Sequence, residues 1–371
     1  MRALVIASAV YALEGGIERF NRRLVRSLDE VRQGGGLDEV RVLGLWDTPE
    51  AGAAAPEGVG FVAASSKRSR FIRRFVSLLL QHRPGVIIYG HVRFAPLVVL
   101  GRLVRPGSQH LLVVHGVEVW DAPRPLHGWI VRNFVDRIVA VSLYSAKRMS
   151  ASYGVPENRF RILPNAMDPA PERSAEPGTA GANVEGRWRL MIVSRLSLID
   201  VYKNVDKVIL ALPQIAASFP DTHCHIVGDG PWRGALERLA RENGVADAVH
   251  FHGQVAERVK EALLEASHIF VLPSTGEGFG IVFLEAWRHR VPVITSNEGA
   301  ASEVVRHGIE GLCVEPTAEQ IAEAVISLLG DPRRRQEMGE RGHRRLLENY
   351  SHERFGETLS SILTEVARCA A

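Results

Sequence analysis

Residues 269–285 read IFVLPSTGEGFGIVFLE, an apolar strand, a Gly-rich loop and the start of a helix. Two carboxylates, Glu277 and Glu285, lie eight positions apart, the first in the loop and the second on the expected helix. A strand–loop–helix turn of this kind directs backbone N–H groups and the positive end of a helix dipole at an anion. The carboxylates can accept hydrogen bonds from hydroxyls beside that anion. A diphosphate between a sugar and a ribose fits this pattern, so the stretch predicts a nucleotide-sugar site.

Short apolar runs alternate with amphipathic helical patterns along all 371 residues, a length that suggests about two domains. Continuous Val, Ile and Leu runs separated by helices are typical of parallel sheets covered on both faces. The runs expected to form strands cover residues 3–7, 40–45, 86–89, 111–114 and 138–141 in the first half, and 190–193, 225–227, 268–272 and 291–295 in the second. We therefore expect an α/β protein with two doubly wound, Rossmann-like domains that face each other across a ligand-binding cleft.

The boundary between these domains is expected at 169–187, which is rich in Pro, Ala, Gly and Glu and has no apolar periodicity. It would separate an acceptor-side domain at 1–168 from a nucleotide-sugar-binding domain at 188–350. The closing segment, 351–371, predicts a helix capped by Ser351 that packs on the first domain. Its apolar face would consist of Phe355, Leu359, Ile362, Leu363 and Val366.

Charge and cysteine content limit the location and the partners. The first 168 residues hold 23 basic and 14 acidic side chains, whereas the rest hold 22 and 28. A basic first half suits an anionic membrane or acceptor, and chance with solvated surface is the alternative. The scattered Cys224, Cys313 and Cys369 have no metal or redox spacing, which is typical of a reducing compartment. Residues 1–10 predict a buried strand rather than a signal peptide, and the expected location is the cytoplasm.

Several polar residues follow predicted strands. Arg195 follows the first strand of the second domain and Lys203 opens the next helix. Two cations at this edge can offset the charges of a diphosphate, although two solvated surface cations would give the same pattern. His115 ends a strand of the first domain, where a structural histidine is the alternative. Gly15-Gly16, after the first strand, permit close backbone approach to a ligand, as any tight turn would.

Other signatures are missing from the sequence. Residues 228–230, Gly-Asp-Gly, are not a dinucleotide fingerprint because Arg233 stands where a third Gly is needed. The sequence contains no Gly-Lys-Ser/Thr phosphate loop and no Gly-x-Ser-x-Gly elbow. It has no Asp-x-Asp pair either. We therefore expect no cofactor and no metal, with the nucleoside diphosphate sugar as donor substrate.

Together these residues resemble the retaining family-four glycosyltransferases (glycosyl transferases group 1) of GT-B fold, over nearly the whole chain. The matching segments are Gly15-Gly16, His115-Gly116 with Glu118, residues 163–168 (LPNAMD), Arg195 with Lys203, residues 227–231 (VGDGP), Glu277 through Glu285-Ala286, and the helix after Tyr350-Ser351. The glutamate motif is specific, and the Gly pairs are supportive.

The resemblance implies roles for these residues. Glu277 would hold the ring hydroxyls of the donor sugar, and Glu285 would bind the ribose hydroxyls. Arg195 and Lys203 would bind the diphosphate, and His115 would contact the sugar from the opposite domain. The leaving phosphate would accept the acceptor's proton on the same face, so the configuration is retained without an enzymic nucleophile. The remaining donor-binding positions would be Gly15, Gly16, Gly278, Phe279, Gly280, Ile281 and Val282.

The sequence departs from the family pattern at two places. His289-Arg290 replace a small residue and Gly before a predicted strand. Asn204 follows the phosphate lysine, where the family often has Gly. Neither change removes a proposed ligand, and both bear on local packing or donor preference.

Residues 67–80 mix five cations with apolar side chains and predict a basic amphipathic helix. One interpretation is a helix that packs Phe71, Phe75, Leu78 and Leu79 on the first sheet, and it is favoured for the apolar face. The cations would remain available for lipid phosphate at the inner face of a membrane. They are Lys67, Arg68, Arg70, Arg73 and Arg74.

The leading hypothesis is a hexosyltransferase that acts on a glycan, glycolipid or small-molecule acceptor in cell-surface polysaccharide or glycoconjugate synthesis, with no nucleic-acid partner. A nucleotide-sugar epimerase of similar fold is a second hypothesis, because Glu277 and His115 do not exclude it. A sugar-nucleotide-binding protein without catalysis is the third. The cation pair argues against it, since binding alone does not require charges directed at a leaving group.

Overall fold

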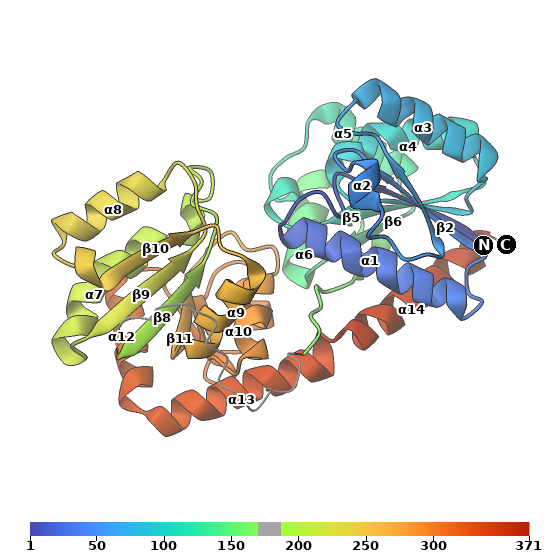
Figure 1. The fold of residues 1–371 in the computed structure, drawn as a ribbon. Helices are drawn as coiled ribbons and strands as arrows, with labels where there is room; N and C mark the ends of the chain where they lie inside the picture. The colour runs from blue at the N-terminus through green and yellow to red at the C-terminus, as the bar shows by residue number, and fades with distance from the viewer. Residues whose placement is uncertain (170–186, 371) are drawn as a thin grey trace. The chain divides into compact units, whose positions relative to one another are not determined.

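The computed structural model describes residues 1–169 and 187–370 and divides the chain into two compact units. Unit 1 comprises Met1–Ala166 and His352–Ala371, and unit 2 comprises Met167–Ser351. Each unit has its own parallel sheet (Figure 1). The positions of the units relative to one another are not determined, so each is described by itself. Most of the linker expected at 169–187 lies outside the described residues.

Unit 1 contains a seven-stranded parallel sheet in the order β3-β2-β1-β4-β5-β6-β7. Its strands are β1 (Arg2–Ala7), β2 (Glu39–Gly44), β3 (Val59–Ala63), β4 (Val86–Tyr89), β5 (Gln109–Val114), β6 (Arg137–Ala140) and β7 (Phe160–Ile162). Its α-helices are α1 (Gly16–Gln33), α2 (Pro49–Gly52), α3 (Arg68–Gln81), α4 (Ala95–Val104), α5 (Pro125–Phe134), α6 (Leu143–Tyr153) and α14 (His352–Ala370). Short 3-10 turns are η1 (Val92–Phe94), η2 (Val117–Val119) and η3 (Glu157–Arg159).

Unit 2 contains a six-stranded parallel sheet in the order β10-β9-β8-β11-β12-β13. Its strands are β8 (Trp188–Val193), β9 (Thr222–Val227), β10 (Val249–Gly253), β11 (Ile269–Leu272), β12 (Val293–Ser296) and β13 (Gly311–Val314). Its α-helices are α7 (Val205–Ser218), α8 (Arg233–Glu242), α9 (Glu257–Ala266), α10 (Ile281–Arg288), α11 (Ala301–Val304), α12 (Ala318–Gly330) and α13 (Pro332–Asn349). The 3-10 turns are η4 (Val201–Lys203) and η5 (Ala246–Ala248).

Strand order reverses once in each sheet, next to the strand that comes first in that unit. In unit 1 the reversal lies between β1 and β4, and in unit 2 it lies between β8 and β11. At such a point the loops that follow the two strands diverge, and ligands of open parallel sheets bind there. Binding residues are therefore expected in the loops after these four strands.

The two-domain parallel architecture predicted from the sequence is confirmed, and each of the nine expected runs overlaps a strand. Four strands were missed, namely β3, β7, β10 and β13. Each of these strands is the outermost strand at one edge of its sheet. Its apolar run is shorter than those of the central strands or is interrupted by polar residues. Residues 249–253 read VHFHG, for example, where two histidines interrupt the run. These strands depend on pairing with a neighbour more than on their own composition.

Helix α14 packs on unit 1 along the face of α1 (Figure 1). All five apolar residues expected on its inner face are buried. Phe355 meets Phe20 of α1 edge to face, with ring centroids 5.4 Å apart. Toward the other end, the carboxylate of Glu365 accepts hydrogen bonds from Arg137 and Arg161. Each buried side chain of this size contributes about 1.5–3 kcal/mol, so α14 is an integral part of unit 1.

Helix α3 buries the side chains predicted to face the first sheet, Phe71, Phe75, Leu78 and Leu79. The same helix leaves the large apolar residues Ile72 and Leu80 exposed, by 47% and 58%. Among the described residues, no helix combines the length and the apolar character that crossing a bilayer requires.

A buried histidine makes the stability of unit 1 depend on pH. The imidazole of His110 on β5 is fully buried and its Nδ1 lies 3.0 Å from the hydroxyl of Tyr89 on β4. Burial lowers the pKa of His110 to about 4. The ordinary value is about 6.5, so as the pH falls the unfolded chain takes up the proton first. The contribution of His110 to stability is therefore complete above about pH 6.5 and is lost as the pH falls toward 4.

We predict that His110→Gln reduces the loss of unit 1 stability between pH 7 and pH 5 by roughly 2 kcal/mol. Hydrogen-exchange mass spectrometry of peptides that cover β4 and β5, corrected for the intrinsic pH dependence of exchange, measures this loss. His127→Gln on α5 is the matched control and should behave as the wild type. Equal pH dependence in the wild type and His110→Gln would contradict the assignment.

Candidate active site

The loops after β8 and β11, at the reversal point of the unit 2 sheet, are tied together by backbone contacts. The N–H of Thr275 donates to the carbonyl of Tyr202 at 2.9 Å. The amide of Asn204 donates to the carbonyls of Tyr202 (3.1 Å) and Pro273 (2.8 Å). Asn204 has a φ of 54°, in the left-handed region that Gly and Asn tolerate best. This conformation explains why Asn can stand where the family often has Gly.

The loop after β9 fits closely against the loop after β8. Its Asp229 carbonyl accepts from the N–H of Leu196 at 3.0 Å, and the N–H of Trp232 donates to the Leu196 carbonyl at 2.8 Å. Gly228 has a φ of 129°, and a Cβ at this position would lie 1.8 Å from the Ser194 carbonyl oxygen. Residues 228–230 therefore serve loop packing here, which agrees with the absence of a dinucleotide fingerprint.

The lysine and the first glutamate of the sequence motif come together in unit 2. The Nζ of Lys203 lies 3.4 Å from Oε1 of Glu277, and their side chains are only 15% and 14% exposed. Within the part of the chain that the structure describes, this Oε1 has no hydrogen-bond partner. The charge of the Lys203 ammonium compensates this buried oxygen only in part, so the oxygen can still accept a hydrogen bond from a ligand hydroxyl.

Arg195 is the exposed member of this set. Its guanidinium lies 3.4 Å from the carboxylate of Asp200, and its side chain is 76% exposed. Asp200 is buried and accepts a hydrogen bond from the Tyr202 hydroxyl at 3.0 Å. Burial, aided by the Asp200 charge, raises the pKa of Tyr202 well above its ordinary value, so the hydroxyl stays a donor. Asp200 and Tyr202 were not predicted, because a short loop carboxylate gives no pattern in sequence.

The loop that carries Glu277 ends in an open helix N-terminus. Gly280 precedes α10 with a φ of 89°, and the ring of Phe283 occupies the space where its Cβ would lie. No side chain in the described chain caps α10. The first backbone N–H groups of α10, at Ile281 and Val282, thus form the positive end of the helix dipole. The ring of Phe279 is buried edge to face against Tyr350, so only the backbone of this predicted donor residue is left for a ligand.

The second glutamate, Glu285, is buried on α10 and has a partner that the sequence did not reveal. The Nζ of Lys260 on α9 donates to its Oε1 at 2.9 Å. The Lys260 ammonium also lies 3.0 Å from Glu257, one turn earlier on α9. The sequence provides only a weak indication that Lys260 is buried, namely that it shares the inner face of α9 with Leu263 and Leu264. A lysine on an apolar face is usually assigned to the rim of a helix.

The predicted residues of unit 1 lie after β1 and β5. The loop after β1 is fixed by the fully buried Asp47, whose carboxylate accepts from the N–H groups of Val10, Tyr11 and Ala12 at 2.8–2.9 Å. This loop leads into Gly15 and Gly16, where α1 begins. Gly15 has a φ of 166°, an extended conformation that any residue adopts, so its conformation alone does not require glycine.

His115 lies in a polar cluster after β4 and β5. Its Nε2 donates to the Gly90 carbonyl at 2.9 Å, and its backbone N–H donates to Glu118 at 2.5 Å. The ring of His91 lies 6.2 Å away, centroid to centroid. Burial lowers the pKa of His91 to about 4, so this imidazole is neutral at pH 7. Sequence reasoning missed His91, although it follows a strand and a Gly just as catalytic loop residues often do.

The predicted site residues thus fall into two groups. Arg195, Lys203, Glu277, Glu285 and residues 278–282 belong to unit 2, where Lys203 and Glu277 are in contact. Gly15, Gly16 and His115 belong to unit 1. Among the described residues, no group of three or more His, Cys, Asp or Glu side chains could hold a metal ion.

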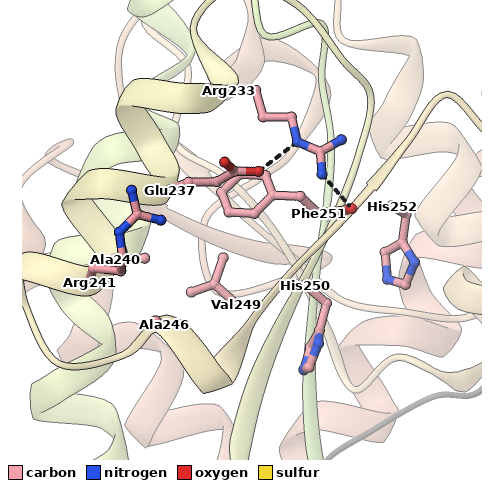
Figure 2. A pocket seen from close by; sticks show the side chains of 9 residues that line it. All are labelled: Arg233, Glu237, Ala240, Arg241, Ala246, Val249, His250, Phe251 and His252. Atoms are coloured by element: carbon pink, nitrogen blue, oxygen red, sulfur yellow. Dashed lines mark hydrogen bonds and ion pairs between the residues drawn. The ribbon is translucent and has the colours of Figure 1, made fainter.

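A separate pocket of about 460 Å³ lies over α8 and β10 in unit 2 (Figure 2). Arg233 crosses it, with its guanidinium bonded to Glu237 at 2.7 Å and to the Phe251 carbonyl at 3.4 Å. His250 and His252 line one side of the pocket. Their rings stack with those of His223 and His225, which gives a group of four stacked imidazoles. The groups that Figure 2 joins are therefore partnered within the pocket itself.

The geometry of the unit 2 loops depends most on the close approach of the Gly228 backbone to the Ser194 carbonyl. We predict that Gly228→Ala destabilises unit 2 by at least about 3 kcal/mol, from left-handed backbone strain and the clash with Ser194. Thermal unfolding followed by hydrogen exchange of β8 and β9 measures it. The control is Gly234→Ala on α8, where a Cβ meets no described atom within 4 Å. That variant should be neutral or slightly stabilising, and similar losses in both would contradict the assignment.

Comparisons with known proteins agree with this geometry. The family model "Glycosyl transferases group 1" matches residues 181–345, and "Glycosyltransferase Family 4" matches residues 14–171. A relative from Mycolicibacterium smegmatis, a GDP-mannose-dependent alpha-(1-6)-phosphatidylinositol monomannoside mannosyltransferase, is 32% identical over 307 residues, covering 78% of this chain and 79% of the relative. A relative of the same name from Mycobacterium tuberculosis is 33% identical over 285 residues, covering 72% and 73%.

Solved structures of low sequence identity share the fold. The structure of Anabaena Alr3699/HepE in complex with UDP has a TM-score of 0.80 at 17% identity, covering 98% of this chain and 100% of that one. Sucrose-phosphate synthase from Thermosynechococcus elongatus has a TM-score of 0.77 at 19% identity, covering all of both chains. The resemblance inferred from the sequence motifs is therefore confirmed: the chain belongs to the family-four (group 1) glycosyltransferases and has the GT-B fold.

Proposed function

We propose that this protein transfers a hexose, with retention of anomeric configuration, from a nucleoside diphosphate sugar to a glycolipid acceptor. GDP-mannose is the first donor to test, because the relatives at 32–33% identity are named as GDP-mannose-dependent mannosyltransferases that act on phosphatidylinositol monomannoside. These relatives match over more than two thirds of their length, so the similarity extends over both units.

The observation that carries the proposal is the grouping of Lys203, Glu277 and the open N-terminus of α10. The donor diphosphate would lie against the N–H groups of Ile281 and Val282, with Lys203 and Arg195 offsetting its charge. Arg195 is exposed enough to swing from Asp200 onto a phosphate. Cations and dipoles fixed before the reaction stabilise the charge that develops on the leaving group. We infer that they take the role that a metal has in other transferases, so activity should survive EDTA.

Glu277 would orient the sugar by accepting its ring hydroxyls at Oε1, the atom that lacks a hydrogen-bond partner among the described residues. Glu285 would accept the ribose hydroxyls. In the reaction, the bond between C1 of the sugar and the diphosphate oxygen breaks, and a bond from C1 to the acceptor oxygen forms on the same face. The acceptor's proton passes to the departing phosphate, so no enzymic nucleophile is required.

His115 and the loop of Gly15 and Gly16 would supply the contribution of unit 1. Because Nε2 of His115 donates to the Gly90 carbonyl, the ring orientation is fixed and Nδ1 is the nitrogen left for a sugar hydroxyl. The epimerase alternative predicts an isomerised or released sugar in the absence of acceptor. The binding-protein alternative predicts donor binding without turnover for any acceptor.

Donor choice and the two glutamates can be tested together. We predict that GDP raises the melting temperature of unit 2 more than UDP, ADP, CDP or dTDP, by a few degrees at ~100 times its dissociation constant. Glu285→Ala should abolish this shift. Glu277→Ala should keep the shift and lower kcat, because its contacts are to the sugar. The control is Glu319→Ala, which removes an exposed carboxylate of α12. Small and equal effects of both substitutions would mean that the motif is structural.

We also propose that α3 brings unit 1 to an anionic membrane. Lys67, Arg68 and Arg73 are exposed, and the exposed Ile72 offers an apolar contact between them. Arg74, by contrast, donates a hydrogen bond to the Ala63 carbonyl, so its guanidinium is less available to a membrane surface. Each exposed cation near an anionic surface contributes about 1 kcal/mol of binding.

We predict that the protein floats with vesicles of phosphatidylglycerol and phosphatidylcholine at low salt, and less so at high salt. Replacing Lys67, Arg68 and Arg73 with Ser should reduce flotation about 100-fold in partition coefficient. A control of equal charge replaces the exposed Arg333, Arg334 and Arg344 of α13 with Ser. Flotation that is absent in the wild type, or equal in both triple variants, would contradict a role for α3.

A further inference from the structure

Lys260 on α9 is a buried cation to which neither the sequence motif nor the proposed reaction assigns a role. Its side chain is only 8% exposed, and that of Glu285 is 3% exposed. Its Nζ donates to Oε1 of Glu285 at 2.9 Å and lies 3.0 Å from Glu257, which is 58% exposed. The ammonium therefore reaches inward from α9 to α10 and is held from both sides by carboxylates.

Stability gives little reason for such a pair. Removing two charges from water costs about as much as their attraction returns, and apolar side chains of similar volume often stabilise a protein as well or better. Neighbouring inner positions of α9 are in fact apolar, at Leu263 and Leu264. What a buried pair does supply is orientation, because each partner is fixed by a short, directional contact. The carboxylate that Lys260 contacts, Glu285, belongs to the candidate donor site.

We propose that Lys260 is a positioning residue for ribose recognition: it fixes the Glu285 carboxylate so that this group accepts the hydroxyls of the donor ribose. The inference rests on the proposed function, since it assumes that the site binds a nucleoside diphosphate. It predicts that Lys260 acts on affinity only through the ribose hydroxyls. The preference for a ribonucleotide over its dideoxy analogue should then depend on Lys260.

A positioning role and a merely structural role of Lys260 predict different changes in nucleotide affinity. A lysine that only held α9 against α10 would, on removal, weaken all nucleotides by the same factor. A lysine that orients Glu285 would, on removal, weaken GDP and leave 2′,3′-dideoxy-GDP almost unchanged. Hydrogen bonds to a charged group are worth about ten-fold to a hundred-fold in affinity, so the difference is measurable.

The test measures dissociation constants of GDP and 2′,3′-dideoxy-GDP, and of UDP and 2′,3′-dideoxy-UDP, by isothermal titration calorimetry. The wild type should prefer the ribonucleotide that it binds by at least ten-fold. Lys260→Met should reduce this preference to less than three-fold, and Lys260→Arg should retain most of it. The matched control is Arg238→Met on α8, which removes an exposed cation of the same unit and should keep the full preference.

Melting temperatures check that the variants fold, because Lys260→Met leaves Glu285 buried without this partner. Should that variant unfold, Lys260→Gln, which keeps a hydrogen-bond donor without the charge, is measured instead and should also lose most of the preference. A full preference in a folded Lys260 variant would overturn the inference and leave the proposed function intact. Equal weakening of both analogues would overturn it too. A wild type that binds neither GDP nor UDP would overturn the proposed function and the inference with it.

Discussion

The constraint on which the candidate site depends is the reversal of strand order between β8 and β11 in unit 2. Parallel strands end at one edge of their sheet, and at the reversal the loops that follow them separate instead of covering each other. Here the loops after β8 and β11 are held together by the backbone contact from Thr275 to Tyr202, and the loop after β8 is also held to the loop after β9 by the contact from Leu196 to Asp229. The polar side chains are therefore carried on a fixed frame, and a ligand meets charges whose positions are set in advance.

The charges themselves are costly to the fold. Lys203 with Glu277 and Lys260 with Glu285 are two lysine–glutamate pairs with little exposure, and both glutamates belong to the loop and helix that follow β11. Such pairs contribute little net stability, and one oxygen of Glu277 is left without a hydrogen bond among the described residues. Local expense of this kind is expected at functional sites, where binding rather than folding determines the residues.

Much of the fold and part of the site could be predicted from sequence for physical reasons. Buried parallel strands such as β1, β4 and β11 have to be continuous apolar runs. Loop residues that could bind a ligand are then recognised from their position in the sequence directly after such a run. Edge strands such as β10 have no such requirement, since one side is free and polar residues are tolerated. Lys260 and His91 were not found in this way, because their importance comes from contacts with residues on other elements, Glu285 and His115. Asp200 was not found because a short loop carboxylate gives no pattern in sequence. Asn204 lies between these two cases. The sequence shows that it departs from the family pattern, but only its left-handed conformation in the structure explains why an asparagine is found there.

A crystal structure of the protein with a bound nucleoside diphosphate would show directly whether the donor binds at the loops after β8 and β11. We predict that the diphosphate lies at the N-terminus of α10, within hydrogen-bond distance of Lys203 and of the N–H groups of Ile281 and Val282, and that the ribose lies against Glu285. A nucleotide bound elsewhere, for example in the pocket between α8 and β10, would contradict it.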